Sequence, residues 1–233
     1  MHILKYILIF LTFLSVSLAN DQKTIAVYVQ PPIADVECAS ALYRVLMTKH
    51  KVRMLHHITL TEENLSDVNC IAFPGGLEDV DNFDKLLSDK KEIVQQFVNR
   101  GGSYLGICMG AYLADKDYFD LLKNVRVTQY IVRPKADFTQ EESTVLPVRW
   151  YKNIHYMYFY DGPTFVGKLN NTKVIATYSN ADAMAIIQNK IGLIGCHPES
   201  LLEWYNESSK LKRYWHKEEH HKLLLDFVNI LLN

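Results

Sequence analysis

The sequence predicts an α/β protein of three layers, with a mostly parallel central sheet, helices on both faces and a β-rich second half. Two patterns support this fold class. In the first half, short apolar runs alternate with amphipathic stretches of helical length, which is typical of parallel strands joined by helices. In the second half, aromatic and β-branched runs follow one another closely, which is typical of antiparallel hairpins.

The first half is expected to supply the parallel strands. Gly101-Gly102 is a common helix stop and ends the second expected helix. Because ligands bind at the carboxyl ends of parallel strands, the turns after the third and fourth strands are candidate sites. The expected strands are 24–29, 51–58, 70–73 and 104–107, and the expected helices are 36–49, 84–99 and one that begins at Met109.

The second half is expected to form antiparallel strands and a final helix. Its runs are rich in Val, Ile, Tyr and Thr, the residue types enriched in strands. The expected strands are 125–132, 144–150, 156–160, 174–178, 183–188 and 192–195, and the final helix is 220–232.

Composition indicates one globular domain over residues 20–233. The chain has 233 residues, 48% of them hydrophobic, which is enough to bury a full core. The formal net charge is −1, and no basic stripe with interleaved aromatic residues is present. We therefore expect no nucleic-acid partner and no role at a membrane surface.

Residues 1–19 have the pattern of a secretory signal peptide. Lys5 precedes an apolar run over 6–16, and Ser17 and Ala19 are the small residues expected before cleavage at Asn20. The run is shorter than the roughly 20 residues of a bilayer-spanning helix, so we expect no stable membrane insertion after cleavage. An uncleaved N-terminal anchor is the alternative. Passage through the secretory pathway would allow glycosylation at Asn64, Asn170 and Asn206.

Cys108 is the strongest candidate for a catalytic residue. Gly106 and Gly110 flank it, an apolar run precedes it and an apolar helical start follows it. This is the pattern of a nucleophile elbow, in which the glycines remove side chains that would clash at a sharp strand-to-helix turn. We expect Cys108 to be exposed at a helix N-terminus, where the dipole favours a thiolate. The alternative is a buried core cysteine.

His197 and Glu199 are the expected partners of Cys108. Pro198 disfavours a helical conformation for His197, so an extended segment is expected, in which residues two apart point to the same side. His197 would act as general base and Glu199 would orient its ring. The alternative is a structural His-Pro turn with a surface carboxylate.

An oxyanion hole is expected beside the cysteine. The Gly75-Gly76 turn follows the strand at 70–73, and Met109 comes directly after the candidate nucleophile. Backbone N–H groups at these positions would stabilise a tetrahedral oxyanion.

The order of Pro74-Gly75-Gly76, the elbow at 106–110 and the His-Pro-Glu motif at 197–199 resembles the class I glutamine amidotransferase-like superfamily. Residues 101–112 are most similar to the amidotransferase-like N-terminal domain of eukaryotic biotin-protein ligases, and residues 160–165 resemble a second stretch of that domain. The resemblance covers residues 24–200. It implies a substrate site that includes Tyr112, Tyr160, Asp161 and Gly162.

Neither a metal nor an organic cofactor is expected. Histidines 216, 220 and 221 include an i, i+4 pair, but Lys217, Glu218 and Glu219 favour a solvated charged face over a metal site. The remaining cysteines are an odd set, which excludes a dense disulfide scaffold. Cys70 and Cys196 are expected to be buried apolar residues, and Cys38 is the third of the set.

Three functions fit these residues. The first is a stand-alone secreted cysteine hydrolase that cleaves a small-molecule amide or γ-glutamyl-type bond through a thioester, for which the secreted γ-glutamyl hydrolases offer a precedent by resemblance. The second is a glutaminase subunit that passes ammonia to a partner synthetase. The third is a non-catalytic binding module or pseudoenzyme. The signal peptide favours the first, because a synthetase needs ATP, which is scarce outside the cell. The oligomeric state stays open.

Overall fold

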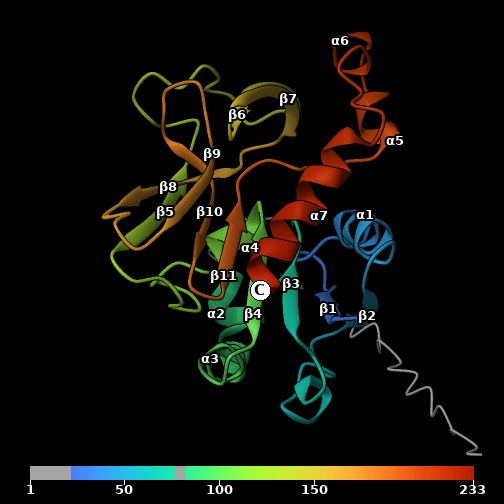
Figure 1. The fold of residues 1–233 in the computed structure, drawn as a ribbon, viewed down its shortest axis with the longest axis vertical. Helices are drawn as coiled ribbons and strands as arrows, with labels where there is room; N and C mark the ends of the chain where they lie inside the picture. Colours follow the sequence, from blue (N-terminus) through green and yellow to red (C-terminus); the bar gives the residue numbers. More distant parts are fainter. Residues whose placement is uncertain (1–21, 77–81) are drawn as a thin grey trace, which may run out of the picture.

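The computed structural model describes residues 22–76 and 82–233, and it confirms the predicted α/β architecture. Five parallel strands form one part of the sheet in the order β2-β1-β3-β4-β11 (Figure 1). The predicted signal peptide lies outside the described residues. No helix within the described ranges has the length and apolar character needed to cross a membrane. The parallel strands are β1 (Thr24–Tyr28), β2 (Lys51–Leu55), β3 (Cys70–Phe73), β4 (Ser103–Ile107) and β11 (Ile191–Ile194).

The sheet continues from β11 through antiparallel strands in the order β10-β9-β6-β7, while β5 pairs with β8 beside β10. The strand β8 was not predicted, because Gly162, Pro163 and Gly167 indicate turns in the sequence. Its pairing with β5, a contact between distant segments, makes it a strand. These strands are β5 (Val125–Gln129), β6 (Thr144–Trp150), β7 (Asn153–Phe159), β8 (Pro163–Gly167), β9 (Lys173–Thr177) and β10 (Ala183–Gln188).

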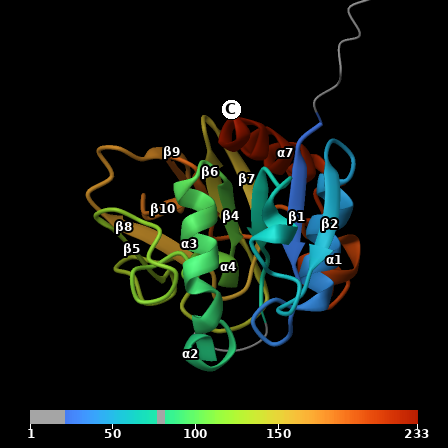
Figure 2. The same cartoon turned by 90° about the horizontal axis from the view of Figure 1, so that it is seen from below.

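Helices cover both faces of the sheet and create two cores. In β1, Ile25 and Val27 belong to one core while Ala26 and Tyr28 belong to the other, as the two-residue period of a strand requires. Helices α1 (Val36–Leu46) and α7 (Glu219–Leu232) pack on the first face. Helices α3 (Lys91–Asn99) and α4 (Met109–Tyr112) pack on the second, and Figure 2 shows α3 and α7 on opposite sides of the strands.

The helix predicted over 84–99 is interrupted. The structure has α2 (Phe83–Leu86), the short 3₁₀ helix η3 (Ser88–Lys90) and then α3. The break falls at Leu87, whose φ of −140° lies outside the helical region and whose side chain is fully buried. Burial of this leucine in the second core therefore outweighs the helical propensity of the segment. The remaining short helices are η1 (Glu63–Leu65), α5 (Leu202–Tyr205) and α6 (Ser209–Lys212).

Replacement of Phe227 tests how far the sheet depends on α7. Phe227 is buried against Trp150 and Gly192, so Phe227→Ala should leave a cavity and lower the free energy of unfolding by about 3–5 kcal/mol. Urea denaturation measures this change. The exposed Lys222 on the same helix provides the control, since Lys222→Ala should change stability by less than about 0.5 kcal/mol. Equal effects of the two substitutions would contradict the packing described.

Candidate active site

Three neighbouring parallel strands bring the three sequence motifs together. Strand β4 lies between β3 and β11, with Phe73 opposite Gly106 and Ile107 opposite Ile194. The Pro-Gly-Gly turn follows β3, Cys108 follows β4, and the His-Pro-Glu segment follows β11. Since parallel strands end at the same edge of a sheet, all three motifs meet at one place.

Cys108 occupies the sharp strand-to-helix turn that its flanking glycines predicted. Its backbone has φ 51° and ψ −110°, a conformation that costs an L-residue on the order of 1–3 kcal/mol. The flanking glycines are required by contact distances: a Cβ on Gly106 would lie 2.3 Å from the Gly110 oxygen, and one on Gly110 would lie 1.9 Å from the Phe73 oxygen. The buried Tyr104 hydroxyl donates to the Gly110 oxygen at 2.6 Å. The turn is thus held tightly in a strained conformation.

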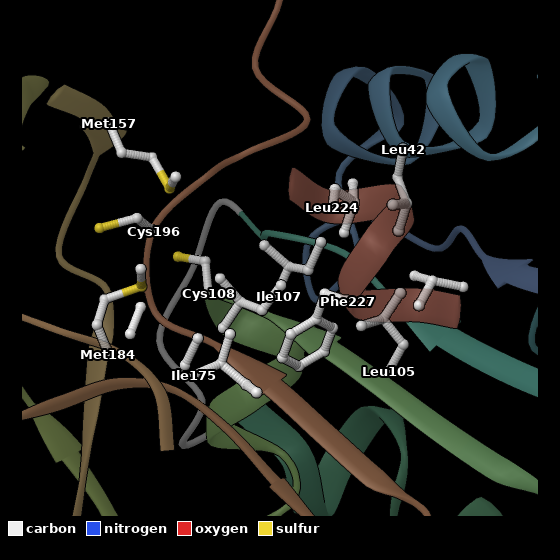
Figure 3. Packing of buried hydrophobic residues seen from close by; sticks show 14 of the residues in the cluster. Leu42, Leu105, Ile107, Cys108, Met157, Ile175, Met184, Cys196, Leu224 and Phe227 are labelled. Carbon is white, nitrogen blue, oxygen red and sulfur yellow. The ribbon is translucent and has the colours of Figure 1, made fainter. Parts of the chain in front are cut away.

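The prediction that Cys108 is exposed is wrong. Its exposed fraction is 8%, and Figure 3 shows it at the end of β4 beside Cys196 and Met184, within the first core. The following helix α4 has only four residues, so its dipole is small. The Sγ atom lies 3.6 Å from the Tyr160 backbone oxygen, which accepts its hydrogen bond. Stabilisation of a thiolate must therefore come mainly from neighbouring side chains.

His197 and Glu199 form a buried pair. The Nδ1 atom of His197 lies 2.9 Å from the Oε1 atom of Glu199. The predicted extended segment is wrong, because the chain turns here and the Ser200 N–H donates to the His197 oxygen. Glu199 is fully buried, so the alternative of a surface carboxylate is also wrong. The turn brings the two side chains together. Because Nδ1 contacts Glu199, Nε2 is the ring nitrogen that is left to interact with Cys108.

The charge on His197 depends on Cys108 and Glu199. Burial by itself lowers the pKa of His197, because it removes water from the charged ring. The negative charges of Cys108 and Glu199, and hydrogen bonds to both, outweigh burial and raise this pKa to about 10. The arrangement therefore favours the charged imidazolium form of His197.

The residues predicted for the oxyanion hole also converge. A Cβ built on Gly75 would lie 2.9 Å from the Cε1 atom of His197, and one built on Gly76 would lie 2.9 Å from the Cγ atom of Met109. The Cβ built on Gly76 would also lie 2.4 Å from the Ile33 backbone oxygen, so a side chain there would clash. The turn after β3 thus contacts both the histidine and the residue that follows the cysteine.

The residues implied by resemblance to bind substrate lie next to Cys108. The Tyr112 hydroxyl donates to the Asp161 backbone oxygen at 3.0 Å, and an Asp161 carboxylate oxygen accepts from Gln129 at 2.9 Å. Asp161 has a positive φ of 43°, which completes a tight turn, and the Tyr160 side chain is half exposed. A Cβ on Gly162 would lie 1.9 Å from the Gly195 oxygen. This turn therefore packs directly against the segment that leads to His197.

Three further residues surround His197: the sequence predicted Tyr158 as core or cleft lining on a strand, and it gave no role at the site to Trp204 or Cys38. The rings of Tyr158 and Trp204 contact its imidazole. The Cβ built on Gly75, which would lie close to His197, would also lie 3.0 Å from the Cys38 sulfur. The sequence had one usable signal for Cys38. Asp35 accepts from the Glu37 and Cys38 N–H groups as an N-cap, and that pattern places the cysteine in the first turn of α1. Nothing in the pattern indicated Trp204.

The histidines near the C-terminus are not a solvated face. His216 and His220 are buried, with exposed fractions of 8% and 3%, and their rings stack 4.1 Å apart. The His216 Nε2 atom contacts the Ser200 hydroxyl at 3.4 Å, so the pair packs beneath the turn that carries Glu199. Within the described ranges, no three His, Cys, Asp or Glu side chains are arranged to hold a metal ion.

The predicted glycosylation sites are all on the surface. Asn64, Asn170 and Asn206 are exposed, and the Asn64 side-chain amide donates to the Thr59 oxygen at 2.9 Å. Exposure is compatible with modification, and glycosylation itself stays a prediction.

The fold is that of the class I glutamine amidotransferases. A crystal structure of a glutamine amidotransferase superposes with a TM-score of 0.62 at 16% identity, covering 89% of this chain and 98% of that one. PurLQS from Thermotoga maritima gives 0.64 at 14% identity, covering 90% and 99%. A glutamine amidotransferase from the same organism also gives 0.64 at 14%, covering 91% and 99%.

Within this fold, the resemblance of residues 101–112 to the N-terminal domain of biotin-protein ligases is confirmed. Residues 30–127 match the family model "Biotin-protein ligase, N terminal". That match includes the Gly75-Gly76 turn and Cys108, and it ends before His197. No curated protein matches the chain.

Cys108 should be the most reactive thiol of the folded protein. Burial raises the pKa of Cys196 and raises that of Cys70 to about 12. Burial, followed by the charges of Glu199 and Cys108, raises the pKa of Cys38 far above its usual range. Those three residues therefore stay protonated, and thiolates are the reactive form. Iodoacetamide labelling followed by peptide mapping should find Cys108 modified first, and faster labelling of any other cysteine would contradict its role as nucleophile.

The buried histidine pair should make the protein sensitive to mild acid. Burial, and then neighbouring histidines, lower the pKa values of His216 and His220 to about 3, whereas an unfolded histidine titrates near about 6.5. The unfolded chain therefore binds more protons below about pH 6.5, so their contribution to stability is complete above that pH and falls as the pH drops towards 3.

Thermal melts between pH 7.5 and 5 measure this dependence, because most carboxylates stay ionised in that range. The melting temperature should fall on acidification in the wild type and fall less in His220→Gln. The same pH dependence in both proteins would show that the pair is not responsible.

Proposed function

We propose that this protein is a cysteine hydrolase that cleaves amide or γ-glutamyl-type bonds through a Cys108-His197-Glu199 triad. The observation that carries this proposal is the convergence of three strand ends, which sets a strained cysteine elbow beside a buried His197–Glu199 pair. A nucleophile, a base and a group that orients the base are the parts that acyl transfer needs. The amidotransferase fold supports an amide as the substrate.

The first half of the reaction forms a thioester. Proton transfer from Cys108 to His197 creates the thiolate, which attacks the carbonyl carbon of the amide. Backbone N–H groups at Met109 and at the Gly75-Gly76 turn stabilise the tetrahedral oxyanion. His197 then donates its proton to the departing nitrogen, the C–N bond breaks, and ammonia or an amine leaves.

The second half of the reaction needs only water. His197 removes a proton from a water molecule, which attacks the thioester carbonyl. The C–S bond then breaks, the carboxylic acid is released, and Cys108 returns to its starting form. Neither ATP nor a second protein takes part in these steps.

The substrate would sit against the turn at 160–162 and the Tyr112 side chain. The support for this placement is the contact of the Cys108 sulfur with the Tyr160 oxygen and the bond between Tyr112 and Asp161. The half-exposed Tyr160 ring offers an apolar surface to the acyl group or the leaving group.

We further propose that the hydrolase acts in the secretory pathway or outside the cell. The support is the signal-like pattern of residues 1–19 and the exposure of Asn64, Asn170 and Asn206. Expression of the full-length chain in a secreting eukaryotic cell tests this. A mature protein that begins at Asn20 in the medium is expected, and retention in the cytosol would contradict it.

The activity test uses residues 20–233 as purified protein, with ammonia or amine release measured from glutamine, γ-glutamyl peptides and simple amides. Turnover without ATP is expected, and Cys108→Ala and His197→Gln should reduce it to background. Glu199→Gln keeps a hydrogen-bonding side chain but loses the charge, so it should lower kcat by a smaller factor, about 10²–10⁴. All three variants should be folded by circular dichroism.

The other functions make different predictions in the same assay. Activity that appears only after addition of a synthetase partner would indicate the glutaminase subunit. Unreactive Cys108 with no turnover on any amide would indicate the binding module or pseudoenzyme. Activity that survives in Cys108→Ala would contradict the thioester mechanism.

A further inference from the structure

Two aromatic rings flank the imidazole of His197. The ring of Trp204 lies 5.4 Å from it, centroid to centroid, with an interplanar angle of 79°. The ring of Tyr158 lies 6.0 Å away at 76°. Tyr158 comes from the end of β7 and Trp204 from α5, so two separate elements place aromatic rings nearly perpendicular to the same histidine.

These rings are held in place by contacts of their own. The Tyr158 hydroxyl donates to the Ser143 hydroxyl at 2.8 Å, and the Tyr158 backbone oxygen accepts from the His197 N–H at 2.9 Å. The two rings pack on each other at 5.3 Å, and Tyr205 packs on Tyr158 at 5.5 Å. Both flanking side chains are buried. Tyr158 therefore contacts the histidine through both backbone and side chain, and Trp204 contacts it through its ring.

This environment affects the charge on His197. The ring is almost completely buried, so the imidazolium form loses most of its hydration. Cys108 and Glu199 are the ionisable groups that act on it, and Gly75 packs against its Cε1 edge. A cation that lies over the face of a Trp or Tyr ring, within about 6 Å of its centroid, is attracted by the ring's quadrupole, and the attraction grows when water is excluded. In a near-perpendicular pair, this attraction acts where the edge of the imidazolium meets the face of the aromatic ring. An aliphatic side chain at the same place would fill space without this attraction.

We propose that Trp204 and Tyr158 are positioning residues that hold His197 in place and stabilise its charged imidazolium form. The inference deepens the proposed function and rests on it in one respect, since the imidazolium is the acid that protonates the leaving nitrogen. Neither residue touches the reacting atoms, so their effect on the reaction passes through His197.

Trp204 is well suited to a clean test. Its buried indole Nε1 has no hydrogen-bond partner among the described residues. Replacement by Phe or Met therefore breaks no hydrogen bond of the indole, and Met fills much of the space with a flexible apolar chain. Trp215 provides a matched control, because it packs in the same small cluster against Tyr205 and contacts other histidines instead of His197.

The experiment is an NMR titration of the histidine rings in ¹⁵N-labelled protein, with the His197 signal assigned by its loss in His197→Gln. In Trp204→Met, the titration midpoint of His197 should fall by about one pH unit. In Trp204→Phe, which keeps an aromatic face, the fall should be smaller. In Trp215→Met, the midpoint should stay at the wild-type value.

An unchanged midpoint in folded Trp204→Met would overturn the proposal, as would an equal fall in Trp215→Met. If Trp204→Met does not fold, Trp204→Phe decides: a fall supports the proposal and a midpoint at the wild-type value overturns it. The titration needs no substrate, so it separates this inference from the proposed function. A shifted midpoint without amide turnover would contradict only the proposed function, and turnover with an unshifted midpoint would contradict only the aromatic stabilisation.

Discussion

The candidate site depends on the parallel pairing of β4 between β3 and β11. This pairing sets Phe73 opposite Gly106 and Ile107 opposite Ile194, so the three following turns meet at one sheet edge. The fit is close: the Cys108 N–H donates to the Ile194 oxygen at 2.9 Å, and the Gly110 N–H donates to the Pro74 oxygen at 3.0 Å. Both bonds cross from the elbow to a neighbouring strand end. A change of strand register would therefore separate all the parts of the site at once.

Charge inside the site is balanced locally. Glu199 and His197 are both buried, and an isolated ion in such a place would be strongly disfavoured. The charged form of His197 is favoured here because Glu199 lies 2.9 Å from its Nδ1 atom and Cys108 also acts on the ring. Burial raises the free energy of a charged group, and it also removes the water that would screen the interaction between His197 and Glu199. Strong coupling among the three side chains follows from this dry environment.

The C-terminal region anchors the turn that carries His197 and Glu199. The Ser200 hydroxyl contacts the Tyr205 hydroxyl at 3.1 Å and the His216 ring at 3.4 Å, while the His221 ring contacts the Ser200 backbone oxygen at 3.1 Å. Helix α7 in turn packs on β4 and β11 through Phe227. The last helix is thus tied both to the strands that carry Cys108 and to the segment that carries Glu199. Stability of the C-terminal region and geometry of the site are linked through these contacts.

The sequence by itself determined the features that depend on local patterns. The alternation of apolar runs predicted the parallel strands, with β3 correct at both ends, and Gly106 and Gly110 predicted the strained elbow because only glycine fits there. Only the tertiary structure decided burial and long-range contacts. Leu87 breaks a helix by entering the core, His216 lies inside despite charged neighbours, and Tyr158 on β7 packs against the ring of His197. These outcomes depend on which distant segments pack together, and a local pattern carries no information about that.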